Sequence, residues 1–540
     1  MGFLYSLRLT RWGIAGFSAL AFALTLLQSV GFYQVVGHTP AERVAFGRSM
    51  AQLAAQFTVL IAAPIRPDTV GGYVQWRAYS FFAILFGIWA LVSAYGAARG
   101  DEERGLVEQV LATGTARTDA LVARVIGFAA GCVVAVAAAA LGMAVGVAGA
   151  HETVGVDSLA GASVNLLGLA LSCYALTLLV CQFAASRFAT AASGIVMLGL
   201  FLLNSLSRQL DQLSGWRWLS PFRYYDLSQP LAPGGVFDVR GVEVLFGSAV
   251  VLAVAAAVAF SYRDVGSPLI RVVPVTPRPD VREPDGNPLW RVPVVRGLYD
   301  RRAGLAVWTI GVALLGVLMV ILTKSMVEPL LGLAQLRPYF NLFITGGIYP
   351  SFLGFIWFGF AQLLIAGYAI AQVARWSAED MDGRLETELS NPLSRRGVLI
   401  ERATVLTIGA LVIAGVSGVA VGIESHVQSI DLNLGRLTAA SLLLVPVALF
   451  FAAIGALLAS RLPRATVGLL GGFAFVSYFI VQLAPIFHWP SWTEDLSAFH
   501  LYGQPLSSGV DITGLVIMLL VVVVGFAVAT VVMERRDVGA

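Results

Sequence analysis

Two segments of the sequence place carboxylates, a glycine and an arginine at matching positions. The first handle runs from Glu102 to Arg117 and the second handle from Asp380 to Arg395, an offset of 278 residues. In each, apolar residues recur at helical spacing behind the acidic start. Ionised groups are costly inside a bilayer, so both handles lie in water, where such a helix can dock another protein. A solvated tip that only joins two spans is the alternative, and the repetition favours docking.

We expect the docking surface to include one set of residues from each handle. These are Glu102, Glu103, Gly105, Glu108, Leu111, Arg117, Asp380, Gly383, Glu386, Leu389 and Arg395.

Two loops combine histidine with carboxylates, the side chains of metal and acid/base sites. They hold His151, Glu152 and Asp157 in one loop, and His488, Glu494, Asp495 and His500 in the other. Neither has the H-E-x-x-H spacing, and neither set is repeated in the other half of the chain. An embedded transferase or protease is therefore disfavoured, and we expect no catalytic residue. The three cysteines fall inside apolar runs, so we expect no disulfide framework and no metal site.

A phosphate-binding loop is absent. That loop needs Gly-Lys followed by Ser or Thr, and the one lysine of the sequence, Lys324, follows Thr323. The chain cannot hydrolyse ATP by that route, and no nucleotide or other cofactor is expected on it.

Composition places these residues in a membrane protein. Hydrophobic residues make up 58% of the 540 residues and charged residues 12%, with a mean hydropathy of +0.80. Apolar runs of about 20 residues predict an all-α polytopic protein with about 12 transmembrane helices. The expected spans are 11–31, 79–98, 121–149, 164–185, 189–207, 242–262, 303–322, 351–373, 398–423, 437–459, 466–486 and 512–533. Before the first span, residues 3–11 are expected to form a short amphipathic surface helix.

Basic residues set the expected orientation in the cell membrane. With both termini cytoplasmic, most of the 35 Lys and Arg residues lie on the cytoplasmic side, as do both handles. The bilayer is then the surrounding partner. A net charge of +3, dispersed along membrane edges, argues against nucleic acid.

The repetition extends beyond the handles. Ser186-Arg187 recurs as Ser460-Arg461, Ser220-Pro221-Phe222 as Ser497-Ala498-Phe499, and Arg263-Asp264-Val265-Gly266 as Arg536-Asp537-Val538-Gly539. These landmarks predict two parallel six-helix repeats, residues 1–263 and 303–540. Residues 264–302, rich in proline and arginine, form the expected cytoplasmic linker with a second surface helix.

Each handle is expected to form its own helix, over residues 100–113 and 378–391. Carboxylates in the opening turn, Asp101 to Glu103 in the first handle, would suit the helix dipole. Thr113-Gly114 would end the first helix and Asn391-Pro392 the second. Ser394 then caps the next span.

The order of spans around E-x-x-G-x-x-E and a later arginine resembles the membrane permease of ABC-2 type (type V) exporters. The fused two-half form looks most like actinobacterial exporters of polyketide antibiotics, the tetronasin type. The resemblance implies that each handle is a coupling helix seated in a separate ABC ATPase, present in two copies, which binds ATP and Mg. It implies export of hydrophobic small molecules. The first handle departs from the family pattern because it has Gly114 where a proline is usual.

The family lines its central cavity with the second and fifth spans of each half. At those positions this chain has aromatic and amide stripes at helical spacing, for which ordinary helix packing is the alternative. They are Phe82, Phe86, Trp89, Phe201, Asn204, Phe355, Phe358, Gln362, Phe475, Tyr478, Phe479 and Gln482. The aromatic segments before the sixth and twelfth spans are expected to form an outer lid.

An ion-coupled multidrug antiporter is the main alternative. Such transporters need an ionisable group within the membrane. No Asp or Glu falls in the middle of an expected span, and Arg124 and Arg402 are expected to reach the headgroups from the span edges.

Overall fold

A computed structural model describes residues 2–57, 63–149, 153–208, 210–269, 292–332, 347–381, 383–390, 394–484 and 489–535. The described residues form helices and no strand, which confirms the all-α prediction. Helices satisfy every backbone hydrogen bond within one segment, as a bilayer requires.

Eleven helices or helical runs are long and apolar enough to cross a membrane. In the first unit they are α1 (Gly2–Val36), the run from α3 (Val70–Val74) through α4 (Ser80–Tyr95) to α5 (Asp101–Glu103), α7 (Arg117–Gly149), α8 (Val156–Phe183), α9 (Ser186–Leu206) and α11 (Val239–Tyr262). In the second they are α12 (Pro293–Gly332), α14 (Ile348–Leu353) with α15 (Gly359–Met381), α17 (Arg395–Val427), α18 (Leu434–Leu442) with α19 (Leu444–Arg461), and α21 (Ile512–Arg535). The expected eleventh span is present as the shorter α20 (Thr466–Leu483).

The expected surface helix over residues 3–11 does not form a separate element, and no separate helix precedes α12 among the described residues of the expected linker. Residues 3–11 belong to α1, which continues from Gly2 into the first span. Residues 293–302 likewise begin α12. In both places the helical hydrogen bonds continue without an intervening break, so neither segment turns onto the surface by itself.

The chain divides into two compact units, Met1–Arg278 and Pro279–Ala540. The division falls inside the expected linker 264–302, of which residues 270–291 lie outside the described residues. The parallel six-helix repeat stays a prediction.

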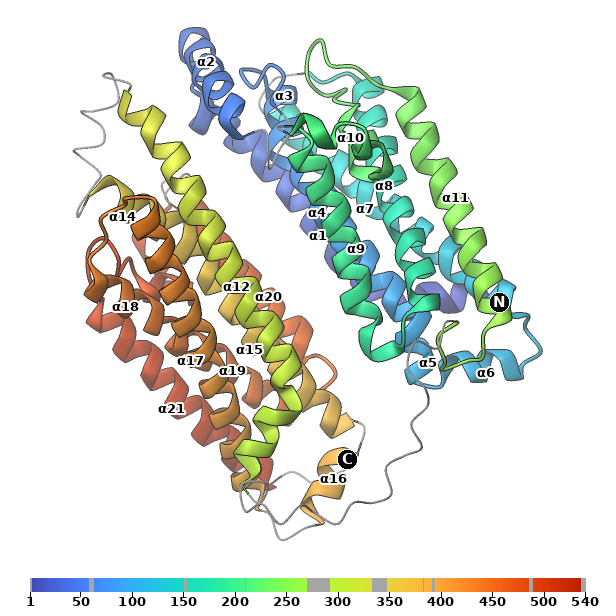
Figure 1. The fold of residues 1–540 in the computed structure, drawn as a ribbon, viewed down its shortest axis with the longest axis vertical. Helices are drawn as coiled ribbons and strands as arrows, with labels where there is room; N and C mark the ends of the chain where they lie inside the picture. The colour runs from blue at the N-terminus through green and yellow to red at the C-terminus, as the bar shows by residue number, and fades with distance from the viewer. Residues whose placement is uncertain are drawn as a thin grey trace. The chain divides into compact units, whose positions relative to one another are not determined.

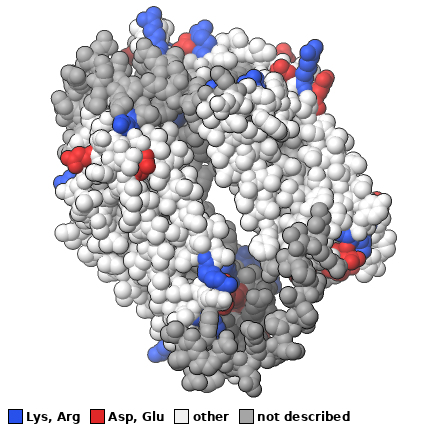
Figure 2. All heavy atoms as spheres, in the orientation of Figure 1, with Lys and Arg blue, Asp and Glu red and all other residues white. Residues whose placement is uncertain are grey.

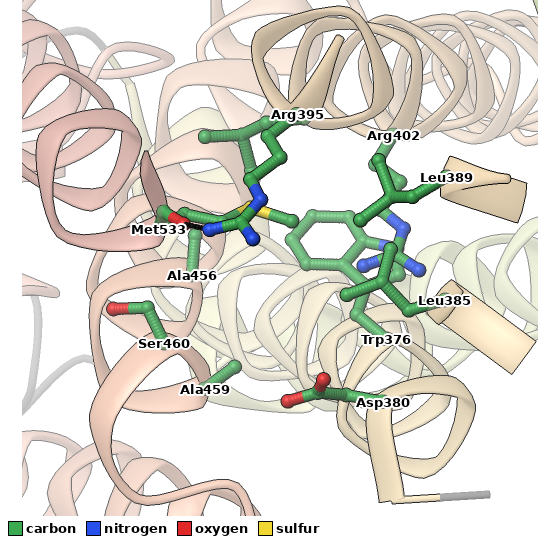
Figure 3. Close-up of a pocket in the computed structure, with 11 residues that line it drawn as sticks. Trp376, Asp380, Leu385, Leu389, Arg395, Arg402, Ala456, Ala459, Ser460 and Met533 are labelled. Carbon is green, nitrogen blue, oxygen red and sulfur yellow. Dashed lines mark hydrogen bonds between the residues drawn. The ribbon is translucent and has the colours of Figure 1, made fainter. Parts of the chain in front are cut away.

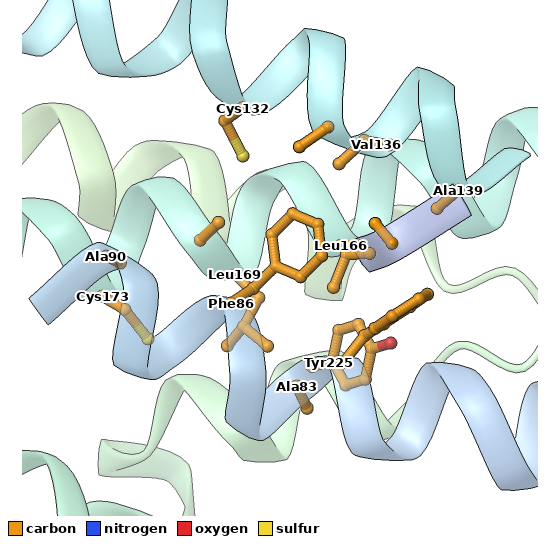
Figure 4. Packing of buried hydrophobic residues seen from close by; sticks show 14 of the residues in the cluster. Ala83, Phe86, Ala90, Cys132, Val136, Ala139, Leu166, Leu169, Cys173 and Tyr225 are labelled. Atoms are coloured by element: carbon orange, nitrogen blue, oxygen red, sulfur yellow. The ribbon is translucent and has the colours of Figure 1, made fainter. Parts of the chain in front are cut away.

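The first unit is held together by close helix packing around small residues. α1 lies along α7, and α8 packs on α4 and α11; Figure 4 shows Phe86 among Leu166, Leu169 and neighbouring alanines. Thr25 Oγ1 donates to Ala139 O at 2.8 Å. A Cβ on Gly142 would lie 2.3 Å from Phe22 O, so only glycine permits this approach.

The second unit has its own core. α12 packs on α17, and α19 packs on α15 and α21. Trp357 and Phe451 are buried in it, and a Cβ on Gly409 would meet Tyr368 Oη at 1.9 Å. The two units thus use the same small-against-large packing with different residues.

Charged residues gather at the ends of the first unit. On the face in Figure 2, its Lys, Arg, Asp and Glu side chains lie at the two ends, with an uncharged surface between them. That is the surface of a protein surrounded by hydrocarbon.

A pair of short helices follows span five in each unit. In the first unit these are η4 (Trp216–Leu219) and α10 (Pro221–Asp226); in the second they are η7 (Ser491–Leu496) and η8 (His500–Tyr502). A serine at the matching repeat position fixes each pair to the preceding span. Ser220 Oγ donates to Leu200 O at 2.8 Å, and Ser497 Oγ donates to Ser477 O at 2.6 Å. In the first unit α10 lies at the end opposite α6 (Leu106–Ala112) (Figure 1).

An aromatic hydroxyl also fixes α10 to span two. Tyr225 Oη donates to Tyr79 O at 2.8 Å, within the π-helical turn η1 (Gln75–Tyr79). Burial raises the pKa of Tyr225, which keeps the phenol protonated and able to donate.

Candidate functional site at the two handles

The acidic residues of the first handle end a long helix instead of starting a new one. α4, the π-helical turn η2 (Gly96–Gly100) and α5 continue one into the next, and the chain then turns at Gly105, whose φ is +69°. The expectation of an opening turn is therefore wrong. Carboxylates at a helix C-terminus oppose the helix dipole, so they need local cations.

Arginines supply that compensation around Glu102. Arg99 Nη1 donates to Glu102 Oε2 at 2.9 Å, and Arg263 forms a second ion pair with the same carboxylate. Arg263 Nε donates to Gln182 Oε1 at 2.7 Å. We call these four residues the Glu102 cluster. Its ionised side chains are at most 3% exposed, so the charges are paired inside the protein.

The cluster also holds the start of the expected linker. Arg99 Nη1 and Arg263 Nη1 both donate to Ser267 O, at 3.3 and 3.0 Å. Gly266 N donates to Glu102 Oε2 at 3.3 Å. Glu102 is therefore an internal anchor and does not face a partner. Spacing in the sequence did not identify Arg99 or Gln182 as its neighbours; the repeated R-D-V-G motif was the one signal for Arg263.

The short helix α6 turns its apolar side toward the body of the unit. Val107 and Val110 line a cavity of about 100 Å³ together with Leu121 and Phe260. Glu108 and Gln109, on the other side of α6, are exposed.

The second handle repeats this arrangement. α15 ends at Met381, Gly383 has a φ of +72°, and α16 covers Arg384–Leu389. Figure 3 shows Leu385 and Leu389 on one side of the Trp376 ring, with Arg395 and Met533 on the other. The cavity that these residues line measures about 50 Å³. Glu386 is exposed on α16.

An ion pair at the same repeat positions joins spans two and three in each unit. Asp101 pairs with Arg124, and Glu379 Oε2 with Arg402 Nη2 at 2.6 Å. The expectation that these arginines reach the headgroups is corrected, because a carboxylate on the neighbouring helix meets each of them.

The arginine that ends each handle binds the last span of its own unit. Arg117 Nη1 donates to Arg263 O at 2.6 Å, and Arg395 Nη1 donates to Met533 O at 2.7 Å. These carbonyls lie at helix ends, where they have no partner within the helix. The handles are thus tied to the second, third and sixth spans.

The two handles differ at the Glu102 cluster. At the offset of 278 that relates the handles, Ser377 stands in place of Arg99 and Asp380 in place of Glu102. Further along the chain, Ser186 and Ser460 set the offset between the repeats, and at that offset Ala456 stands in place of Gln182. Ser377 is buried, and its hydroxyl makes no hydrogen bond among the described residues. The second unit therefore lacks the counterparts of Arg99 and Gln182, while Arg536, the counterpart of Arg263, lies outside the described residues.

The expected docking residues divide by exposure. Glu103, Glu108 and Glu386 are exposed; Gly105 and Gly383 make the turns; Leu111, Leu389 and Asp380 are half-buried. Glu102, Arg117 and Arg395 make the internal contacts described above. Asp382 and residues 391–393 lie outside the described residues. Docking itself stays a prediction.

The expected substrate-path residues differ in their exposure, and the path that they would line stays a prediction. Phe82, Phe86, Phe358 and Gln362 are buried within their own units, and Asn204 Nδ2 donates to Asp226 Oδ2 at 2.7 Å. These five side chains are buried inside their own units. Phe355 is 62% exposed. Trp89, Phe201, Phe475, Tyr478 and Phe479 are half-buried, and the side chain of Gln482 lies outside the described residues.

No group of three or more His, Cys, Asp or Glu suited to a metal ion occurs among the described residues. His500 lies near Glu494 and Asp495, at 3.5 and 3.7 Å. His151, Glu152 and His488 lie outside the described residues.

Comparisons with known proteins agree with this architecture. The family model described as multidrug efflux system permease Rv1217c, C-terminal domain, matches residues 7–261 and 297–533. The multidrug efflux system permease protein Rv1217c of Mycobacterium tuberculosis (strain ATCC 25618 / H37Rv) is 27% identical over 371 residues. That match covers 67% of this chain and 62% of the relative's own length.

Proposed function

Because the chain belongs to the family of the multidrug efflux system permease Rv1217c, C-terminal domain, we propose that it is the membrane permease of an efflux system and moves hydrophobic small molecules out of the cell. More specifically, we propose that it is an ABC-2 type permease of the antibiotic-exporting kind. A separate ATPase, in two copies, binds ATP and Mg and drives it. Both termini and both handles then face the cytoplasm.

The pair of handles carries this proposal. Each is a short helix with a glutamate exposed on one side, Glu108 or Glu386, and apolar residues packed inward on the other. Side-chain contacts tie each handle to spans of its own unit. A force applied to such a helix is passed to those spans, because packed elements move as bodies and do not deform continuously.

The test reverses the exposed charge on both handles. We expect Glu108→Arg with Glu386→Arg to lower ATP hydrolysis stimulated by the permease, and export of a fluorescent hydrophobic dye, by about tenfold, because reversed charges repel the partner's surface. Both are measured with the full chain and its ATPase in proteoliposomes. The control is Glu243→Arg, an exposed carboxylate four residues after the start of α11 at Val239.

Full export from the double variant would remove the coupling role. Export that needs no ATPase and stops when the proton gradient is collapsed would favour the antiporter instead.

A further inference from the structure

Three arginines lie in the segment between the fifth and sixth spans of the first unit. Arg217 lies in η4, Arg223 in α10, and Arg208 just after α9. Trp218 lies between two of them: its ring centroid is 5.5 Å from Arg217 Cζ and 5.0 Å from Arg223 Cζ. We call these four residues the arginine cluster.

Among the side chains that the structure describes, one carboxylate forms an ion pair with the cluster. Asp226 pairs with Arg208 and also accepts from Asn204. No ion pair joins Arg217 or Arg223 to a carboxylate among the described side chains, although the charge of Asp226 acts on Arg223, and the Nε atoms of both arginines are buried without a hydrogen bond. Burial and the neighbouring Arg217 lower the pKa of Arg223. Among the described side chains the cluster therefore sets three guanidinium groups against one carboxylate, which leaves a positive balance of charge.

The second unit shows that the local backbone does not need these arginines. Ser220 and Ser497 make the same two contacts, to the preceding span and to the backbone N–H two residues later. In the register set by these serines, an offset of 277, Glu494, Asp495 and His500 stand where the first unit has Arg217, Trp218 and Arg223. The same framework thus carries two carboxylates and a histidine in place of two arginines and a tryptophan.

The surface beside the cluster is apolar. Trp216, Trp218 and Leu219 are 63%, 44% and 64% exposed. Exposed tryptophans of this kind lie at the boundary between headgroups and acyl chains. Cationic side chains and an exposed apolar surface therefore lie next to each other.

We propose that the arginine cluster binds the phosphate or carboxylate head of an anionic amphiphile, with Arg217 and Arg223 as donors and the tail against Trp216 and Leu219. Guanidinium groups form two parallel hydrogen bonds with either anion. The amphiphile is a phospholipid of the bilayer or an acidic molecule on its way out. The site does not depend on the proposed efflux function, since a lipid would occupy it in either case.

The test measures ligand-induced stabilisation of the full chain in neutral detergent. We expect dioleoylphosphatidylglycerol, oleate or both to raise the melting temperature more than the zwitterionic dioleoylphosphatidylcholine does, with less effect at high salt. A rise with the lipid alone identifies a phosphate head, and a rise with oleate identifies a carboxylate. Equal responses to all three additives in wild type would overturn the proposal without any variant.

The variant R217Q/R223Q locates the site. We expect its half-saturating concentration for the anionic additive to rise about tenfold, the loss that follows from removing charge-assisted hydrogen bonds. The matched control is R240Q, an exposed arginine at the start of α11. An anionic response that R217Q/R223Q retains in full would also overturn the assignment.

Discussion

At the scale of residues, the first handle depends on a buried charge. Glu102 faces two arginines, Arg99 and Arg263, and all three side chains are almost fully enclosed. Such a group is costly to bury and is even more costly to leave half-paired. The cluster fixes where α5 ends and where the linker begins, since its members also bind Ser267 O.

Glu102→Gln should therefore destabilise the first unit by about 3–5 kcal/mol, because the two arginines lose their counter-charge while remaining buried. The measurement is the melting temperature of the purified chain in detergent. Glu108→Gln, an exposed glutamate six residues later, should leave that temperature unchanged. Equal melting temperatures for the two variants would mean that water molecules solvate the two arginines in place of the lost carboxylate charge.

At the scale of elements, each handle is a helical run broken by a glycine. Gly105 and Gly383 both have positive φ, and α6 and α16 begin one residue later. A left-handed residue lets the chain leave the long second span and lay a short helix across the end of the unit. The apolar side of that helix then packs inward, which leaves its glutamate exposed.

Gly105→Ala should strain this turn by about 1–2 kcal/mol, the cost of left-handed backbone for a residue with a Cβ. No atom lies within 4 Å of the added Cβ, so a steric clash makes no contribution. We expect faster hydrogen exchange of the amides in residues 106–112. Gly96→Ala, equally open but without a positive φ, is the control. Unchanged exchange in the Gly105 variant would show that the turn tolerates a side chain.

At the scale of the whole molecule, the chain forms two units with separate cores. The cluster of buried apolar residues in the first unit ends at Phe260, and that of the second begins at Val312. Each core therefore draws its hydrophobic stabilisation from its own segment of the chain.

Residues 1–278 and 279–540, made as two polypeptides, should each insert and unfold cooperatively with heat. Division after Ala184, between α8 and α9, cuts through the first core and should abolish the cooperative transition of that unit. Both are followed by the change in helical circular dichroism on heating. A broad transition for residues 1–278 would contradict the independence of the first core.

Local chemistry was enough to predict several features from the sequence. Apolar runs of span length predict the helices, because a bilayer leaves few alternatives for the backbone. Ser394 was expected to cap the next span and does so, accepting from Gly397 N at 3.0 Å. Thr113-Gly114 ends α6 as expected, with Gly114 at a φ of +83°. Each of these features depends on neighbours within a few residues.

The direction in which each charged or aromatic side chain points was decided by the tertiary structure. Glu102 was expected to face a partner and instead meets Arg263, 161 residues later. Phe86 was expected along a substrate path and is buried in the core of its unit. A helical stripe states which residues share a face, but not what covers that face. That depends on which distant helices pack against it, and the repeat does not specify those helices.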